Sequence, residues 1–154
     1  MRITLESSRI EFFQIINEDL INSILFDDYV KEGINDDLGV YVYKENEDLQ
    51  YIGCYVDGDL AGLFYTMRLS AIEVESHIAL LKEYRPYARV LAKAYTDFIF
   101  NEGYLRITTF VCDFNRSVVN MCLKIGFKYE GLMRKCCIKN GIFYDKHVMG
   151  YVKG

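Results

Sequence analysis

Two side chains that can accept a proton lie two residues apart within residues 71–81. Apolar and polar residues alternate there as in a β-strand, which places Glu75 and His77 on one face together with Glu73. A carboxylate or imidazole with a pKa near neutrality can take the proton of a substrate ammonium group, directly or through water. The alternative is a solvated polar face, which suits Glu73 at least as well. Glu75 and His77 are therefore candidate catalytic bases, with both interpretations open.

The cysteines are the next reactive groups. Their number is odd, and no two have the spacing of a zinc knuckle or a thioredoxin-like site. Cys136 and Cys137 are adjacent, but neighbouring residues of a strand point to opposite faces, which argues against a redox pair. We therefore expect all of them to pack as small hydrophobic residues: Cys54, Cys112, Cys122, Cys136 and Cys137.

Acidic residues come in pairs within residues 26–38, at Asp27–Asp28 and Asp36–Asp37. Paired carboxylates can bind a metal ion, but charges in a connecting loop are more often solvated. We expect solvated charges at both pairs and no metal site in the protein.

The elements that must position these groups follow from changes in apolar spacing. At residues 10–25 apolar side chains recur at intervals of three and four, which predicts that a helix with Ser7 or Ser8 as its N-cap opens the fold. The acidic segment is expected to be a connecting loop, with a second short helix as an alternative. Alternation then predicts four antiparallel strands, with a tight turn at Asp57–Gly58, over residues 39–43, 49–56, 60–69 and 71–81.

The second half of the chain switches between helix and strand. Helical spacing predicts a helix over residues 87–102 that ends at Gly103. The remaining elements are a strand, a short helix and two strands joined at Asn140–Gly141, over residues 105–111, 117–124, 127–138 and 142–152. The strand–helix–strand crossover implies one parallel pair. The sequence predicts an α+β fold with one mixed, mostly antiparallel sheet and flanking helices, in a single domain of residues 1–154.

Composition excludes several classes of protein. The chain has 154 residues and a formal net charge of -4, which argues against nucleic acid as a partner. Residues 1–10 are interrupted by charges and no run of 18 apolar residues occurs, so we expect neither a signal peptide nor a membrane span. The expected location is the cytoplasm.

The C-terminal half carries a combination of motifs typical of one superfamily. Residues 115–127 begin with an asparagine at a strand end and continue as a short amphipathic helix that closes on Lys-x-Gly-Phe. Further motif residues follow at Glu130–Gly131, Arg134, Asn140–Gly141 and Asp145. This combination resembles the GNAT superfamily of acetyl-CoA-dependent N-acyltransferases, in the branch that acetylates ribosomal-protein N-termini. The resemblance implies a sheet with one splayed parallel pair and direct transfer of an acetyl group to a peptide or small-molecule amine.

The resemblance also implies where acetyl-CoA would bind. In the family an Arg/Gln-x-x-Gly-x-Gly/Ala turn opens a helix, and its backbone N–H groups hold the pyrophosphate. Residues 85–90 align with this turn, but Ala88 and Val90 replace both glycines and Pro86 removes a backbone donor. Arginines can compensate through bidentate phosphate contacts. The implied cofactor-binding residues are Arg85, Tyr87, Ala88, Arg89, Val90 and Leu91, with Asn115 orienting the pantetheine arm.

Two catalytic positions follow from the same resemblance. Glu75 lies ten residues before Arg85, where the family often carries a glutamate near the substrate amine. Cys122 stands where many members have the tyrosine that protonates the leaving thiolate, so it is a candidate acid, with a packed thiol as the alternative.

Two functions are consistent with the sequence. The first is an acetyl-CoA-dependent N-acetyltransferase of a peptide or small-molecule amine. The second is a catalytically inactive protein of the same fold that acts through protein–protein contacts. The chain has a weaker resemblance to small phage head-assembly proteins of this fold, and such a protein would occupy the virion or the host cytoplasm.

Overall fold

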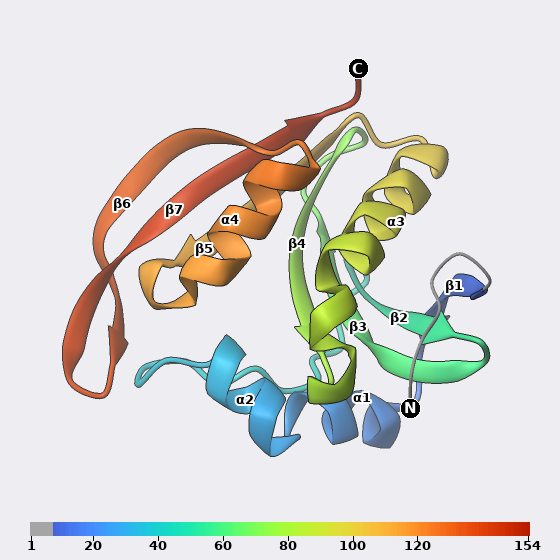
Figure 1. Ribbon diagram of the computed structural model, residues 1–154, viewed down its shortest axis with the longest axis horizontal. Coiled ribbons are helices and arrows are strands. Elements are labelled where there is room, and N and C mark those ends of the chain that lie inside the picture. The colour runs from blue at the N-terminus through green and yellow to red at the C-terminus, as the bar shows by residue number, and fades with distance from the viewer. Residues whose placement is uncertain (1–7) are drawn as a thin grey trace.

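The structure, a computed structural model, describes residues 8–154, and its centre is one seven-stranded mixed sheet in the order β1-β2-β3-β4-β5-β7-β6 (Figure 1). The strands are β1 Ile10–Ile15, β2 Leu49–Val56, β3 Asp59–Arg68, β4 Glu73–Leu80, β5 Arg106–Cys112, β6 Lys128–Lys139 and β7 Ile142–Val152. The helices are α1 Glu18–Leu25, α2 Asp28–Ile34, α3 Ala88–Asn101 and α4 Arg116–Ile125, with 3₁₀ helices η1 Lys82–Tyr87 and η2 Asp113–Asn115. This architecture confirms the predicted fold class.

The N-terminal element differs from the prediction. Residues 10–25 do not form one helix, because Ile10–Ile15 pairs as an edge strand with β2, from Ile10 opposite Val56 to Ile15 opposite Tyr51. Its β-branched and aromatic side chains suit a pleated surface as well as a helix face, and sheet pairing decides between the two. The helix begins later, with Asn17 as the N-cap that accepts the Leu20 N–H. Ser8 precedes β1, and Ser7 lies outside the described residues.

The acidic segment contains the second short helix, α2, but the strand predicted over residues 39–43 is wrong. This segment is irregular, and side chains satisfy its backbone. The Tyr41 N–H donates to Asn35 Oδ1 at 2.8 Å, and the Tyr43 N–H donates to Asn22 Oδ1 at 3.0 Å. Alternating apolar residues therefore line a loop here, because asparagine side chains take the place of a partner strand.

From β2 onward the predicted elements are present with small shifts of their ends. Asp57 and Gly58 have φ values of 50° and 87°, the left-handed conformation of a two-residue hairpin turn. Asn140 and Gly141 repeat this geometry between β6 and β7, with φ values of 53° and 78°. The two strongest turn signals of the sequence therefore both mark hairpins.

Strands β4 and β5 form the predicted parallel pair and diverge as predicted. Their pairing runs only from Glu73 opposite Arg106 to Glu75 opposite Thr108, after which the two strands separate (Figure 1). Helix α3 makes the crossover between them. The splayed ends leave the backbone of β4 unpaired on this side beyond Glu75, which opens a gap in the middle of the sheet.

Two clusters of buried residues pack on the two sides of the sheet. The larger includes Leu91 and Tyr95 of α3 and Val119 and Cys122 of α4. The smaller joins α1 and α2 to the other side of β2–β4 through residues such as Ile21, Val30, Leu63 and Ala79. No helix within residues 8–154 is long and apolar enough to cross a membrane.

The expectation that every cysteine is a packed thiol is wrong for two of them. Cys112 at the end of β5 and Cys137 in β6 form a disulfide across a sequence separation of 25 residues. Cys54 and Cys122 are buried free thiols, and Cys136 is half-buried. Local spacing did not indicate the pair because only the approach of β5 and β6 brings these residues together.

Candidate active site

The gap between β4 and β5 opens into a cavity of about 920 Å³. His77, Tyr65 and Tyr41 line it from the side of the sheet that carries α1 and α2. Tyr95 of α3 and Cys122 of α4 line it from the opposite side. Residues from both sides of the sheet therefore line one cavity between the splayed strands.

Glu75 and His77 form a hydrogen-bonded pair at this gap. Glu75 Oε2 lies 2.7 Å from His77 Nε2, and their side chains are only 26% and 20% exposed, which excludes a simple solvated face. The hydrogen bond from His77 lowers the pKa of Glu75, against the opposing effect of burial. Glu75 is therefore a carboxylate at neutral pH and holds the Nε2–H of His77. In the neutral imidazole this tautomer puts the acceptor lone pair on Nδ1.

Glu73, on the same face, has a different role. Its carboxylate accepts hydrogen bonds from Thr108 Oγ1 at 2.5 Å and Arg106 Nε at 3.2 Å. Arg106 in turn donates to Glu130 of β6. Glu73 thus joins β4 to β5 at their paired ends and is neither a solvated charge nor part of the cavity wall.

Two tyrosines that the sequence did not single out complete the surroundings of His77. The rings of Tyr65 and Tyr41 lie 5.6 and 5.9 Å from the imidazole, centroid to centroid. Burial raises the pKa of Tyr41 to about 12, so its hydroxyl keeps its proton. Tyr65 pairs directly opposite His77 in the β3–β4 hairpin, so the register could have identified it. Tyr41 comes from the irregular segment, for which no sequence signal predicted this position.

On the opposite side of the sheet, a buried hydroxyl cluster joins α3 to the strands. Tyr95 Oη lies 2.6 Å from both Ser76 Oγ and Thr66 Oγ1. The Tyr95 ring stacks on Phe64 with centroids 4.0 Å apart. Burial raises the pKa of Tyr95, so it acts as a neutral hydroxyl that fixes α3 against β3 and β4.

The turn aligned with the family's phosphate-binding motif is a compact 3₁₀ helix, η1, that contains Pro86. Its backbone is internally bonded, and the Ala88 N–H donates to the carbonyl of Arg85. Helix α3 begins at Ala88, so the N–H groups of Arg89 and Val90 belong to its first turn, which has no carbonyl partners within α3 itself. Leu91 is fully buried, and its N–H lies beyond that first turn.

Basic side chains surround the start of α3. Arg85 lines the cavity and donates to Ser117 of α4. Val90 is 42% exposed and lies in a small surface pocket together with Arg89, Lys93 and Lys124. Lys93 follows Arg89 by one helical turn, so helical spacing alone could have predicted that the two share a surface. Lys124 lies on α4, and no local spacing predicted its position here. Val90, which replaces one of the family's glycines, therefore lies beside basic side chains that can contact phosphate.

Of the three remaining predicted residues, Asn115 and Cys122 line the cavity. Asn115 Nδ2 donates to the carbonyl of Gly33 in α2 at 2.7 Å, so its amide joins α2 to the start of α4. Burial raises the pKa of Cys122 to about 12, which keeps it a thiol at neutral pH. Tyr87, which completes the predicted set, is half-buried at the N-cap of α3 and does not line the cavity.

Three of the four paired aspartates accept backbone N–H groups, whereas Asp28 is a solvated charge as expected, 96% exposed beside Lys31. Asp27 is the N-cap of α2 and accepts the N–H groups of Tyr29 and Val30. Asp36 and Asp37 accept N–H groups from the β6–β7 hairpin. Within residues 8–154 no cluster of side chains is suited to hold a metal ion.

Solved structures share this fold. A spermidine N-acetyltransferase from Vibrio cholerae, solved with CoA and spermine, matches with a TM-score of 0.76 at 16% identity over 96% of each chain. The ribosomal-protein-S18-alanine N-acetyltransferase from Escherichia coli matches with a TM-score of 0.71 at 13% identity, over 95% of this chain and 96% of that one. No protein-family model and no curated protein sequence matches the chain. The likeness confirms that the chain has the GNAT fold.

Proposed function

We propose that the protein is an N-acetyltransferase that uses acetyl-CoA to acetylate a primary amine, on a small molecule or a peptide N-terminus. The observation that carries the proposal is that His77, hydrogen-bonded to Glu75, lines a cavity formed by residues from both sides of the sheet. Direct transfer requires a base beside the amine and a separate binding side for the acyl donor. The GNAT fold of the chain supports the same conclusion.

His77 is the proton acceptor in this proposal. Its Nε2–H donates to Glu75, so Nδ1 can take a proton from a substrate ammonium, and the adjacent carboxylate then stabilises the imidazolium. Glu75 itself is a weaker base, because its lowered pKa makes protonation unfavourable at neutral pH. Glu75 therefore orients His77 and adds a negative charge that attracts a cationic acceptor.

The opposite side of the cavity suits the acyl donor, and acetyl-CoA would supply an acetyl group activated as a thioester. The residues that would hold its phosphates are Arg89 and Lys124 at the surface pocket and Arg85 at the cavity, with the N–H groups of the first turn of α3. Charges on flexible side chains replace the close backbone contact of a glycine turn. We therefore expect this protein to bind acetyl-CoA more weakly than a protein with the glycine turn. Cys122 lines this side as a protonated thiol, but its raised pKa makes it a poor proton donor to the leaving thiolate, which favours the alternative of a packed thiol.

The test is acetyl transfer to a panel of aliphatic polyamines and short peptides, with the product detected by mass spectrometry. For an acceptor that is turned over, His77→Gln is expected to lower kcat by about 10²- to 10⁴-fold, the usual contribution of a general base. Glu75→Gln is expected to lower kcat in the same direction, because the imidazole loses its orienting carboxylate. His147→Gln is the matched control, since this second histidine pairs with Asp113 outside the cavity. Rates that do not respond to His77 or Glu75 would refute the assignment.

One observation favours the alternative of a non-catalytic assembly protein. The β6–β7 hairpin exposes several large apolar side chains: Tyr129, Leu132, Met133, Ile142 and Phe143. Such a surface suits contact with another protein. If no acceptor in the panel is acetylated and acetyl-CoA does not bind, this surface becomes the leading candidate for function.

A further inference from the structure

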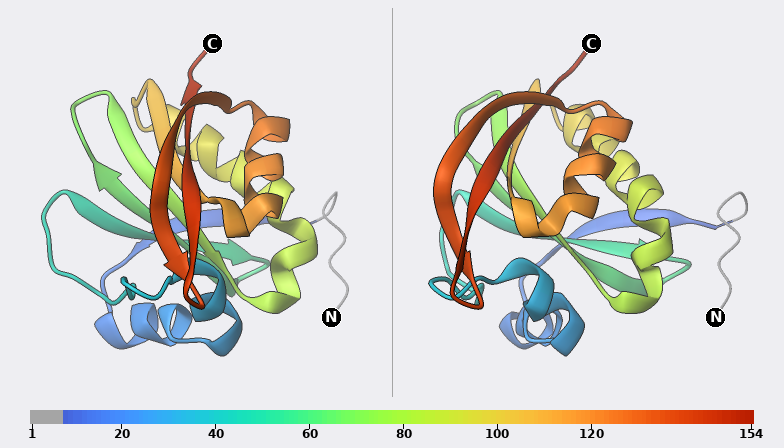
Figure 2. Two further views of the ribbon diagram at one scale, coloured as in Figure 1. Left: turned by 90° about the vertical axis from the view of Figure 1, so that its left-hand side faces the viewer. Right: turned by 60° about the vertical axis from the view of Figure 1, so that its left-hand side comes forward.

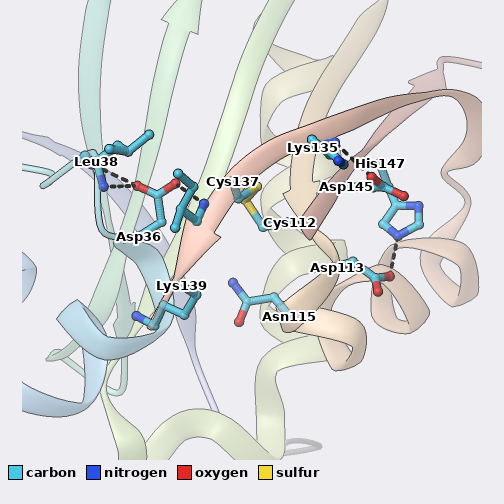
Figure 3. The surroundings of a disulfide bond; sticks show 12 residues. Asp36, Leu38, Cys112, Asp113, Asn115, Lys135, Cys137, Lys139, Asp145 and His147 are labelled. Atoms are coloured by element: carbon cyan, nitrogen blue, oxygen red, sulfur yellow. Dashed lines mark hydrogen bonds and ion pairs between the residues drawn. A yellow bond between two sulfur atoms is a disulfide. The ribbon is translucent and has the colours of Figure 1, made fainter. Parts of the chain in front are cut away.

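We propose that the Cys112–Cys137 disulfide is a thiol–disulfide exchange site through which a dithiol reductant controls access to the cavity. The disulfide joins the end of β5 to strand β6 of the β6–β7 hairpin (Figure 3). As regulation of catalysis the inference rests on the function proposed above. As control of cavity access it stands independently of that function.

The tip of the β6–β7 hairpin lies beside the segment that follows α2 in both views of Figure 2, and hydrogen bonds join the two. Asp37 accepts the N–H groups of Asn140 and Gly141 at 3.0 and 2.9 Å, and its own N–H donates to the Ile138 carbonyl at 2.6 Å. Asp36 Oδ2 accepts the Ile138 N–H at 3.2 Å. We call these contacts the hairpin latch.

Lys139 adds a second part to the hairpin latch. Its Nζ donates to the carbonyls of Glu32 and Asn35, both at 2.7 Å, at the end of α2. Its side chain is only 14% exposed, and the ammonium lies 5.4 Å from the ring centroid of Phe114. The Lys139 side chain of the hairpin therefore holds the C-terminus of α2 through two backbone carbonyls.

The latched segment forms one wall of the cavity. Residues lining it from this segment include Val30 and Gly33 of α2 and Gly39, Tyr41 and Lys44 beyond it. The Gly33 carbonyl also accepts the Asn115 amide. A shift of the hairpin tip would thus move the wall that covers the acceptor side of the cavity and would release Asn115.

The disulfide is a direct link between the hairpin end and β5. Strand β7 lies between β5 and β6, so β6 has no backbone pairing with β5. The β6–β7 register also shifts between Met133 and Cys137, which leaves only the pairs from Cys137–Tyr144 to Lys139–Ile142 beyond the irregularity. Reduction would leave this short distal part of the hairpin without its covalent connection to the splayed strand.

The geometry also determines which sulfur is attacked. Cys137 is fully buried and does not line the cavity, whereas Cys112 is half-buried and does. A thiolate of the dithiol attacks Cys112 Sγ, forms a mixed disulfide and displaces the Cys137 thiolate, which takes up a proton. The second thiolate of the reductant then closes its own disulfide and releases Cys112. Two electrons pass from the reductant to the protein, and both cysteines end as thiols.

The experiment compares amide hydrogen exchange in the oxidised protein and after treatment with dithiothreitol. Reduction is expected to accelerate exchange of residues 29–44 by about tenfold or more, while exchange of the β2–β3 hairpin stays unchanged. Cys112→Ser and Cys137→Ser are each expected to show the fast exchange without reductant. Cys136→Ser, which keeps the disulfide, is expected to respond to dithiothreitol like the unmodified protein.

Equal exchange of residues 29–44 in the two redox states would overturn the proposal, as would alkylation showing that Cys112 and Cys137 remain free thiols after oxidation. The exchange measurement uses neither acetyl-CoA nor an amine. Faster exchange with no acetylation in either state would therefore refute the proposed function and leave the redox site standing. Acetylation with unchanged exchange would do the opposite.

Discussion

At the scale of single residues, strand alternation predicted the shared face of Glu75 and His77 but not their direct hydrogen bond, which depends on side-chain rotamers. The same limit applies to Asp36 and Asp37, whose partners lie about a hundred residues further along the chain. Local pattern identifies which groups are polar. Whether a polar group meets solvent or a distant backbone N–H is decided by packing.

Ionised carboxylates make stability depend on pH at this scale. The hydrogen bond and charge of Arg106 lower the pKa of Glu130 below its ordinary value of 4.5, and His147 lowers that of Asp113 below 3.8. A group whose pKa is lower in the folded state stabilises the fold above its unfolded pKa, and this contribution is lost as pH falls through the folded value. The free energy of unfolding, measured with urea, is therefore expected to decrease as pH falls below about 4.5. Glu130→Gln should flatten that decrease, and an unchanged slope would contradict the assigned ion pair.

The hydroxyl cluster at Tyr95 gives a second prediction at this scale. Tyr95→Phe leaves Ser76 and Thr66 without this partner in a buried position, so we expect a loss of about 1–3 kcal/mol in unfolding free energy. Adding Ser76→Ala to Tyr95→Phe should cost less than the sum of the two single changes. Strictly additive losses in a urea-unfolding cycle would show that the hydroxyls are not coupled.

At the scale of elements, the prediction was accurate where turns and caps punctuate the chain and wrong where they do not. Asp57–Gly58, Gly103 and Asn140–Gly141 all have positive φ, and the elements beside them were placed within two residues. Between β1 and α1 the only boundary signal is Asn17, which sits inside a continuous apolar pattern. That pattern fits a helix and a strand equally, so only the pairing partner β2 distinguishes them.

At the scale of elements, the start of α3 predicts how strongly acetyl-CoA stabilises the protein. Because η1 is internally bonded and a Cβ is present at Val90, millimolar acetyl-CoA is expected to raise Tm by about 2 °C or less. Restoring glycine at both positions, with Ala88→Gly and Val90→Gly, should enlarge the shift even though each glycine costs up to about 1 kcal/mol of helix stability.

Ala94→Gly is the control for that experiment, because it weakens the same helix away from the turn. It should lower Tm without changing the shift caused by acetyl-CoA. A shift of roughly 5 to 10 °C in the unmodified protein would correspond to full occupancy at micromolar Kd. That result would mean that the basic side chains of Arg89 and Lys124 fully replace the glycine turn.

At the scale of the whole molecule, the order of elements predicted the parallel pair of β4 and β5 on either side of α3. It did not predict that β7 lies between β5 and β6, which α4 connects. The divergence of β4 and β5, where the cavity opens, was implied by the family resemblance and not by the order of elements. The order of elements did not predict that α2, the irregular segment and the β6–β7 hairpin cover this opening. This covering depends on contacts between the two ends of the chain, such as Lys139 with Asn35, which no local spacing records.

The register shift in β6 has a consequence for how the molecule behaves in solution. Among the described strands β6 is the last in the sheet, and a long regular strand at that place would offer a template for edge-to-edge aggregation. The shift interrupts the strand around Lys135, whose φ of 51° breaks the extended backbone, and Arg134 and Lys139 add positive charge on either side. An incoming strand would find neither a continuous row of hydrogen-bonding groups nor an uncharged edge. The irregularity that shapes the hairpin thus also protects the protein from open-ended polymerisation.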